Sequence, residues 1–190
     1  MRVDLGIILK LLEKNGEKGA KLHERIAKIA ELEQYTLLTP PYNAQRVKHL
    51  IAVAEDQEAL GFKFPKAYVN LMQCFDGGWL FTDRLFSLDD EDNEENDLIL
   101  ENLALRDADA IPEGTVAVGV TNFGAYIVIR PDGSIGLWDM DEEAYCEEYD
   151  DLYAWLDEML AIAGDMIAHG TLRVMEDVDD DEADEEENDG

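Results

Sequence analysis

The chain has 190 residues, of which 46% are hydrophobic, and a formal net charge of −30 at pH 7. This apolar content is normal for a folded protein and excludes wholesale disorder, and because no apolar run approaches the roughly 18 residues of a membrane span, we expect none. So negative a charge disfavours nucleic acid and anionic membranes as partners.

The charge is divided unequally between the two halves of the chain. Residues 1–84 contain 12 Lys or Arg and 11 Asp or Glu, whereas residues 85–190 contain 3 basic and 34 acidic residues. A field concentrated in this way raises the rate of encounter with cationic proteins. The sequence therefore predicts a basic protein partner and neither nucleic acid nor membrane binding.

The first 43 residues predict a helical hairpin. Apolar residues recur at helical spacing over residues 3–12 and again over 18–33, with Asn15-Gly16 as the stop between them. The second helix has a basic flank of Lys21, Arg25 and Lys28. Two prolines within residues 39–43 break the helical pattern, so we predict residues 1–43 to be an N-terminal helical extension.

The middle of the chain predicts two helices, a short extended segment and a third helix. Helical spacing runs over residues 44–60 and 66–75, and the segment 79–88 reads as strand or extended chain. Residues 89–97 form a predicted polar loop with seven carboxylates, and residues 98–108 are again helical in pattern.

The clearest strand signals follow. Residues 116–120, 126–130 and 135–138 are rich in β-branched and other apolar residues, and a Pro-Asp-Gly-Ser turn separates the last two of these segments. Residues 152–167 predict a closing helix, and residues 171–175 a last strand.

These patterns predict an α+β domain over residues 44–175, with a small twisted sheet, antiparallel or mixed, flanked by helices. The 15 residues from 176 to 190 hold 11 acids and no base, which predicts a disordered acidic tail.

No constellation of catalytic or metal-ligating residues stands out. The three histidines are scattered, and the acidic loops beginning at Asp89 and Asp139 lack the glycine that an EF-hand requires at its sixth position. We predict a protein that is not an enzyme and has no cofactor and no metal site. Cys74 and Cys146 have apolar or aromatic neighbours and are predicted to be buried free thiols. With no signal segment apparent, we expect a cytoplasmic location.

The acidic stretches and the aromatic residues beside them are the candidate binding elements. Trp79, Phe81 and Trp138 are interpreted either as core residues or as interface anchors, and the acidic stretches either as solvated loops or as a surface that contacts a partner. The predicted contact residues are Trp79, Asp89, Asp90, Asp92, Asp139 and Asp141.

The order of short motifs over residues 44–163 resembles the SUKH superfamily, which includes the fungal cell-wall synthesis regulator and many bacterial immunity proteins. The motifs are residues 55–61, Phe64-Pro65-Lys66-Ala67-Tyr68, residues 71–75 followed by Asp76-Gly77-Gly78, Ile111-Pro112, Val118-Gly119, Asn122-Phe123-Gly124, the turn at 131–133, and a final helix with Leu152, Trp155 and Leu156. The resemblance assigns structural roles to Gly61, Pro65, Tyr68, Gly77, Gly78, Pro112, Gly119 and Gly124.

The resemblance implies a binding role without catalytic residues. It leads us to expect an immunity protein that neutralises a basic toxin such as a nuclease. The alternative is a regulator or scaffold that docks signalling or cell-envelope proteins, with the tail and the helical hairpin as docking elements. The sequence leaves the oligomeric state open.

Overall fold

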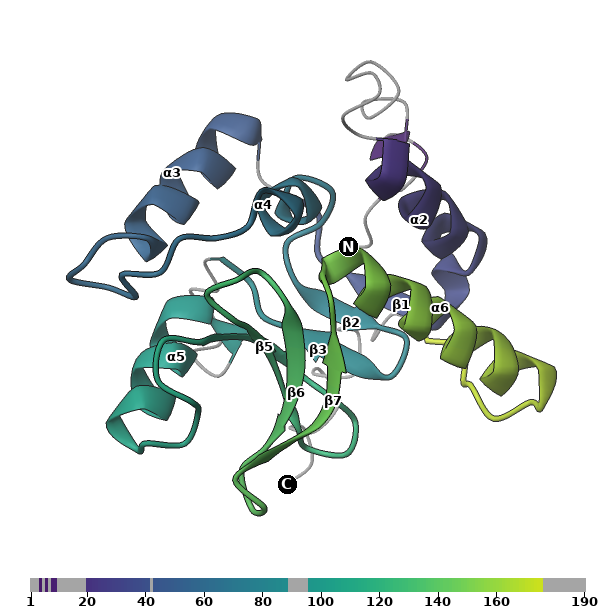
Figure 1. The fold of residues 1–190 in the computed structure, drawn as a ribbon. Helices are drawn as coiled ribbons and strands as arrows, with labels where there is room; N and C mark the ends of the chain where they lie inside the picture. The colour runs from purple at the N-terminus through teal and green to yellow at the C-terminus, as the bar shows by residue number, and fades with distance from the viewer. Residues whose placement is uncertain are drawn as a thin grey trace, which may run out of the picture.

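Five α-helices and seven strands make up the part of the chain that the computed structural model describes, residues 4, 6, 8–9, 20–41, 43–88 and 96–175 (Figure 1). The helices are α2 (Ala20–Glu31), α3 (Ala44–Ala54), α4 (Lys66–Met72), α5 (Leu98–Asp107) and α6 (Leu152–Ala168), with the 3-10 helix η2 (Glu33–Tyr35). The strands are β1 (Thr36–Leu38), β2 (Gly78–Leu80), β3 (Asp83–Leu85), β4 (Val116–Val120), β5 (Tyr126–Ile129), β6 (Ile135–Asp139) and β7 (Ala144–Tyr149).

The strands form one antiparallel meander in which each strand pairs with the next along the chain, in the order β1 to β7. The register shifts within the β4–β5 pair and again within the β6–β7 pair, which bends the sheet and increases its twist. The predicted α+β class with an antiparallel sheet is confirmed. Strand β7 lies at an edge of the sheet.

Side chains fix where three of the helices begin. Asn43, Asp97 and Asp151 each precede a helix and accept hydrogen bonds from backbone N–H groups two or three residues further on. Each bond satisfies a donor that the first helical turn leaves unpaired, which typically contributes about 1 kcal/mol. These caps explain why the polar segments before α3, α5 and α6 give way sharply to helix.

Helix α2 packs against α6 (Figure 1). Its buried stripe is Leu22, Ile26 and Ile29, as the periodicity predicts. From the basic flank of this helix, Arg25 forms an ion pair with Asp157 and donates to a backbone carbonyl of α6. The second helix of the predicted hairpin is therefore present, while the first lies largely outside the described residues.

One hydrophobic core joins the sheet to the helices. Phe75, Phe86 and Trp155 are among its largest fully buried side chains, and buried residues of α2 and β1 belong to the same core. Asn102 of α5 is also fully buried, and its amide both donates to the Ala117 carbonyl and accepts from the Ala117 N–H of β4. Segments on both sides of residue 44 contribute to this core. The division into an N-terminal extension and a domain at this residue stays a prediction.

Three motif glycines lie where the backbone leaves no room for a side chain. A Cβ at Gly78 would lie 2.4 Å from the Leu37 carbonyl oxygen, and one at Gly119 would lie 2.4 Å from that of Arg84. Gly77 and Gly78 also have positive φ angles, of 71° and 97°. Glycine at these positions lets β2 approach β1, and β4 approach β3, at pairing distance.

The other motif residues lie in turns and at a helix start. Gly61 and Gly124 have positive φ angles in the connections after α3 and between β4 and β5. Pro65 is the N-cap of α4, Tyr68 on that helix is buried, and the Pro112 carbonyl accepts hydrogen bonds from Thr115 in the approach to β4.

Three expectations about local structure are wrong, and one strand was not predicted. Residues 139–151 contain strand β7 as well as loop, and residues 171–175 form no strand. Strand β1 precedes the predicted domain and was not expected. Cys146 is exposed, because it lies at the irregular position of the edge strand, whereas Cys74 is buried as expected.

Candidate protein-binding surface

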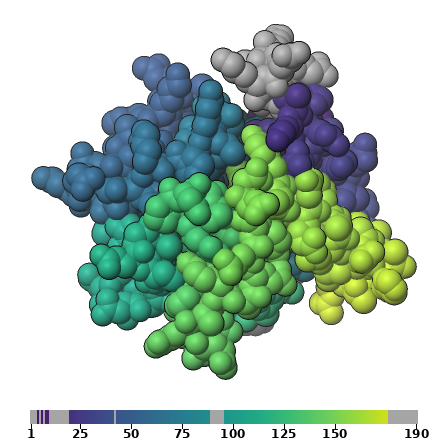
Figure 2. All heavy atoms as spheres, in the orientation of Figure 1, coloured from purple at the N-terminus to yellow at the C-terminus, as the bar shows by residue number. Residues whose placement is uncertain are grey.

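The hairpin formed by β6 and β7 carries the densest group of described carboxylates. Eight Asp or Glu and no Lys or Arg lie between Asp139 and Asp151, and β7 exposes most of its side chains. Figure 2 shows the tip of this hairpin projecting from the rest of the surface. An exposed edge strand invites pairing with other chains, and acidic side chains there oppose pairing between two copies of this protein. The same charges are accessible to a cationic partner.

The two predicted contact residues at the turn of the hairpin, Asp139 and Asp141, have different roles. The Asp139 carboxylate is half-buried and accepts hydrogen bonds from the backbone N–H groups of Asp141 and Glu142, at 2.9 and 3.2 Å. Asp139 therefore shapes the turn. Asp141 is exposed and presents its carboxylate, with those of Glu142 and Glu143, to the solvent.

Aromatic packing supports the hairpin directly next to its turn. Tyr145 of β7 contacts Trp138 of β6 edge to face, with 5.0 Å between ring centroids. The guanidinium of Arg130 lies over the Tyr145 ring at 4.2 Å and also pairs with Glu148. The Trp138 indole N–H donates to the Ala110 carbonyl at 2.9 Å. The acidic turn is thus presented on an ordered support, which lowers the entropy lost on binding.

The other predicted carboxylates, Asp89, Asp90 and Asp92, lie outside the described residues. The structure does describe the two ends of the loop that contains them. Ser87 donates its N–H to the Asn96 carbonyl and accepts from the N–H of Leu98, both at 2.8 Å. The ends of this acidic loop are therefore held together.

Asp76 supports the base of that loop, a role that the sequence reasoning missed. Its side chain is 1% exposed and accepts hydrogen bonds from the Ser87 hydroxyl at 2.6 Å and the Leu88 N–H at 2.9 Å. The available signal was the acid directly before Gly77-Gly78, since an acid next to a backbone reversal is well placed to accept from nearby N–H groups.

Of the three aromatic residues interpreted as core residues or interface anchors, Trp79 is the most exposed. Phe81 is buried and Trp138 is half-buried, but the Trp79 side chain is 41% exposed. It lines a pocket of about 350 Å³ whose other walls come from three separate parts of the chain. The lining residues are Trp79, Phe81, Thr82, Asn122, Met166, Thr171, Leu172, Arg173 and Met175.

The described ranges of the chain contain neither a candidate metal site nor a candidate membrane span. No group of three or more His, Cys, Asp or Glu there is arranged to hold a metal ion, and no helix there is long and apolar enough to cross a membrane.

The chain belongs to the SMI1/KNR4 family (SUKH-1), whose family model matches residues 50–158, more than half of the sequence. The match runs from within α3 into α6 and covers the acidic hairpin. No curated protein and no solved structure matches the chain. Family membership agrees with the resemblance seen in the motifs and is consistent with a protein-binding role of the immunity or regulatory kind.

Proposed function

We propose that this protein is an immunity protein that binds a basic toxin, such as a nuclease, through the acidic hairpin of β6 and β7. The observation that carries the proposal is the ordered acidic turn at a sheet edge, where Asp141, Glu142 and Glu143 are exposed. The proposed role is binding, and it assigns no catalytic residue to this chain.

Charge explains why a toxin of this kind suits the surface. An enzyme that cuts nucleic acid holds phosphates with Lys and Arg, so its substrate-binding surface is cationic. An inhibitor with dense carboxylates is steered to that surface and associates faster than a neutral one would. Covering the cationic surface then excludes the substrate.

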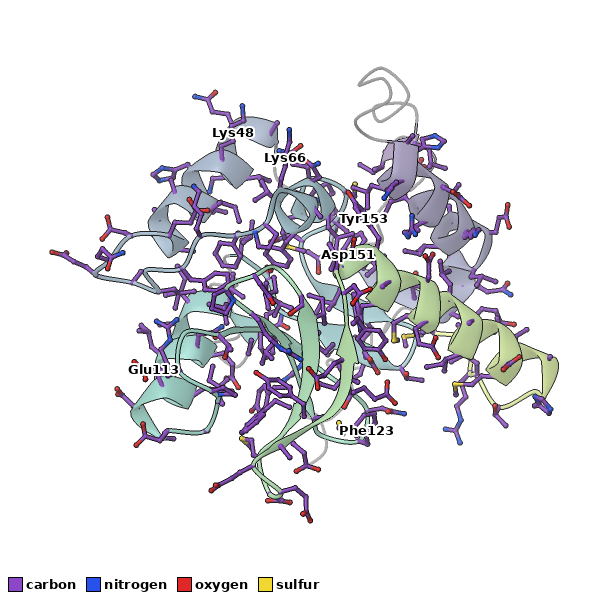
Figure 3. The ribbon with its side chains drawn as sticks, viewed as in Figure 1. Lys48, Lys66, Glu113, Phe123, Asp151 and Tyr153 are labelled. Atoms are coloured by element: carbon purple, nitrogen blue, oxygen red, sulfur yellow. The ribbon has the colours of Figure 1, made fainter. Side chains whose placement is uncertain are left out.

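Matched variants test the assignment to the hairpin. The tip variant Asp141→Asn/Glu142→Gln/Glu143→Gln removes three exposed charges at the turn. A control variant, Glu58→Gln/Asp107→Asn/Glu113→Gln, removes three exposed charges from other elements. Figure 3 shows Glu113 well away from the hairpin. Both variants have the same net charge.

The assay is protection of cells that co-express a candidate basic toxin encoded beside this gene, together with the affinity for that toxin in vitro. We expect the tip variant to bind about tenfold more weakly at about 50 mM salt, and the control variant to lose less than about twofold. Equal losses in the two variants would show that net charge alone matters and would contradict a role for the hairpin.

A chain truncated after Met175 separates this proposal from the alternative regulatory or scaffolding role. If the folded hairpin binds the toxin, the truncated chain keeps its protection. Loss of protection with the hairpin intact would favour docking through the acidic segment 176–190.

A further inference from the structure

Strand β7 leaves one of its two edges open. It pairs with β6 on one side and is the last strand of the sheet. In an antiparallel pair, every second residue directs its backbone N–H and C=O away from the neighbouring strand. Among the described residues, no segment other than β6 forms backbone hydrogen bonds with residues 144–149. The open edge therefore offers a row of donors and acceptors to another chain.

The other edge of the sheet is less accessible. Strand β1 has three residues, none of them exposed, whereas four of the six residues of β7 are exposed. The chain also returns to the β1 side after α6, where the Met175 N–H donates to the Gln34 carbonyl at 2.9 Å. Figure 2 shows the β6–β7 hairpin at the front of the molecule, with no other segment over it. A partner strand would therefore add at β7.

The open edge is long enough to pair and is ordered before binding. The register shift leaves Cys146 without a partner, and residues 147–149 continue the regular ladder with β6. Pairing over three residues already joins β1 to β2 and β2 to β3 in this sheet. The contacts of Tyr145 with Trp138 and Arg130 hold the strand in place, which lowers the entropy lost on pairing.

The side chains along the open edge determine the charge of its occupant. Successive residues of a strand lie on opposite faces of the sheet. Glu147 accepts a hydrogen bond from the Tyr149 hydroxyl on one face, and Glu148 pairs with Arg130 on the other. Within the described residues, Arg130 is the one Lys or Arg that pairs with an acid of this edge. The exposed acids of the strand and its flanks are Glu142, Glu143, Glu147, Glu148 and Asp150.

These charges exclude a second copy of this chain as the occupant. Pairing two β7 strands would bring the glutamates of one copy next to those of the other, and like charges on paired strands destabilise a sheet. Opposite charges on paired strands stabilise it. An extended segment that carries Lys or Arg therefore gains at the same positions where a second copy loses.

We propose that an extended segment of the partner, with Lys or Arg at successive positions, adds to this sheet as a further strand along β7. Its backbone pairs with the open edge, and its basic side chains contact carboxylates on both faces. The inference rests on the proposed binding of a basic protein and adds the form of the recognised segment. The β6–β7 turn steers the partner, and the strand edge holds it.

Three backbone-cyclised β-hairpin peptides test the edge on the full-length chain. The first carries lysines along both strands, the second is the same peptide with N-methyl groups on its outward-facing amides, and the third has glutamates in place of the lysines. N-methylation keeps the charge and the internal pairing of the peptide but removes the donors that would pair with β7. NMR follows binding through the chemical shifts and the hydrogen exchange of the β7 amides.

We expect the lysine hairpin to bind at about 50 mM salt and, at saturation, to slow hydrogen exchange at the outward-facing amides of residues 146–149 by about tenfold or more. The N-methylated hairpin is expected to bind about tenfold more weakly, because it loses the hydrogen bonds with the strand edge. The glutamate hairpin is expected not to bind.

Exchanging charges on the protein complements the peptide series. Glu147→Lys/Asp150→Lys is expected to weaken binding of the lysine hairpin and to allow the glutamate hairpin to bind. Asp107→Lys/Glu113→Lys is the matched control, since it makes the same change in net charge at exposed residues of other elements. At about 100 mM salt we expect this control to change either affinity by less than about twofold.

Three results would overturn the inference, and they differ in what they say of the proposed function. Equal binding of the lysine hairpin and its N-methylated form would exclude strand pairing and leave the acidic hairpin as an electrostatic site. Equal binding of the lysine and glutamate hairpins would show that the edge does not select a basic segment. Failure of the lysine hairpin to bind at about 50 mM salt would count against the strand edge and the acidic hairpin together.

Discussion

Two buried aspartates in the β2–β3 region, Asp76 and Asp83, have opposite effects on the stability of the fold. Asp76 accepts two hydrogen bonds at the base of the acidic loop, one from the Ser87 hydroxyl and one from the Leu88 backbone N–H. Asp83 is also buried, and burial raises its pKa above that of an exposed aspartate, although its hydrogen bonds with Thr82 and Asn122 lower that pKa. Asp76 therefore supports the fold, while the charge on Asp83 is a cost.

Replacing Asp76 with Ala is expected to lower the free energy of unfolding by about 3 kcal/mol, because it leaves buried donors unpaired. Asp76→Asn keeps one acceptor oxygen and is expected to cost less. Urea denaturation measures both changes, and amide exchange at Leu88 reports whether the loop base opens. Equal stability of Asp76→Ala and the natural chain would show that these bonds do not hold the loop.

Asp83→Asn is expected to raise stability at neutral pH by an amount on the order of 1 kcal/mol. A carboxyl group whose pKa is raised by folding favours the folded state below its unfolded pKa, and that advantage is lost as the pH rises through the folded pKa. The gain from Asp83→Asn should therefore shrink between about pH 7 and about pH 4. A gain that is constant over this range would mean that the charge on Asp83 carries no cost.

At the scale of elements, periodicity predicted the interior of the fold well and its edges badly. The helices α3 to α6 and the strands β4 to β6 each bury a face, so their apolar residues recur at a readable spacing. Strand β1 has three residues, too few for a pattern, and β7 has polar residues because an edge strand exposes its side chains to water.

The candidate site was predictable only in part, for a related reason. The acidity of residues 139–151 is visible in the sequence, but the hydrogen bonds that turn Asp139 inward depend on the hairpin. The Trp79 pocket has walls from four segments, and no sequence pattern records that Met166 and Asn122 are neighbours of Trp79.

Alanine substitutions of a strand glycine and of a helix glycine are expected to have opposite effects on stability. Gly119→Ala would bring a Cβ within 2.4 Å of the Arg84 carbonyl oxygen and force β3 and β4 apart, so we expect a loss of about 3 kcal/mol or more. Gly164→Ala meets no atom within 4 Å on α6, and the gain in helix propensity should stabilise the protein by about 0.5 to 1 kcal/mol. Thermal unfolding of the two variants checks this, and a tolerated Gly119→Ala would contradict the described strand register.

At the scale of the whole molecule, charge is separated along the fold. Lys48 and Lys66 are exposed on α3 and α4, at the end of the molecule opposite the acidic turn of β6 and β7 (Figure 3). Exposed acids also lie elsewhere, among them Asp107 and Glu113. The segment 139–151 differs from these in holding eight carboxylates and no Lys or Arg. A cationic partner approaching the molecule is therefore oriented toward the hairpin and away from α3 and α4.

The association rate constant with the toxin, measured by stopped flow as a function of salt, tests this account most directly. We predict that the rate constant falls by at least about tenfold between about 50 and 500 mM salt, and that the tip variant Asp141→Asn/Glu142→Gln/Glu143→Gln shows a shallower dependence. A rate constant that does not change with salt, or the same dependence in the tip variant, would contradict capture of a basic partner by the acidic hairpin.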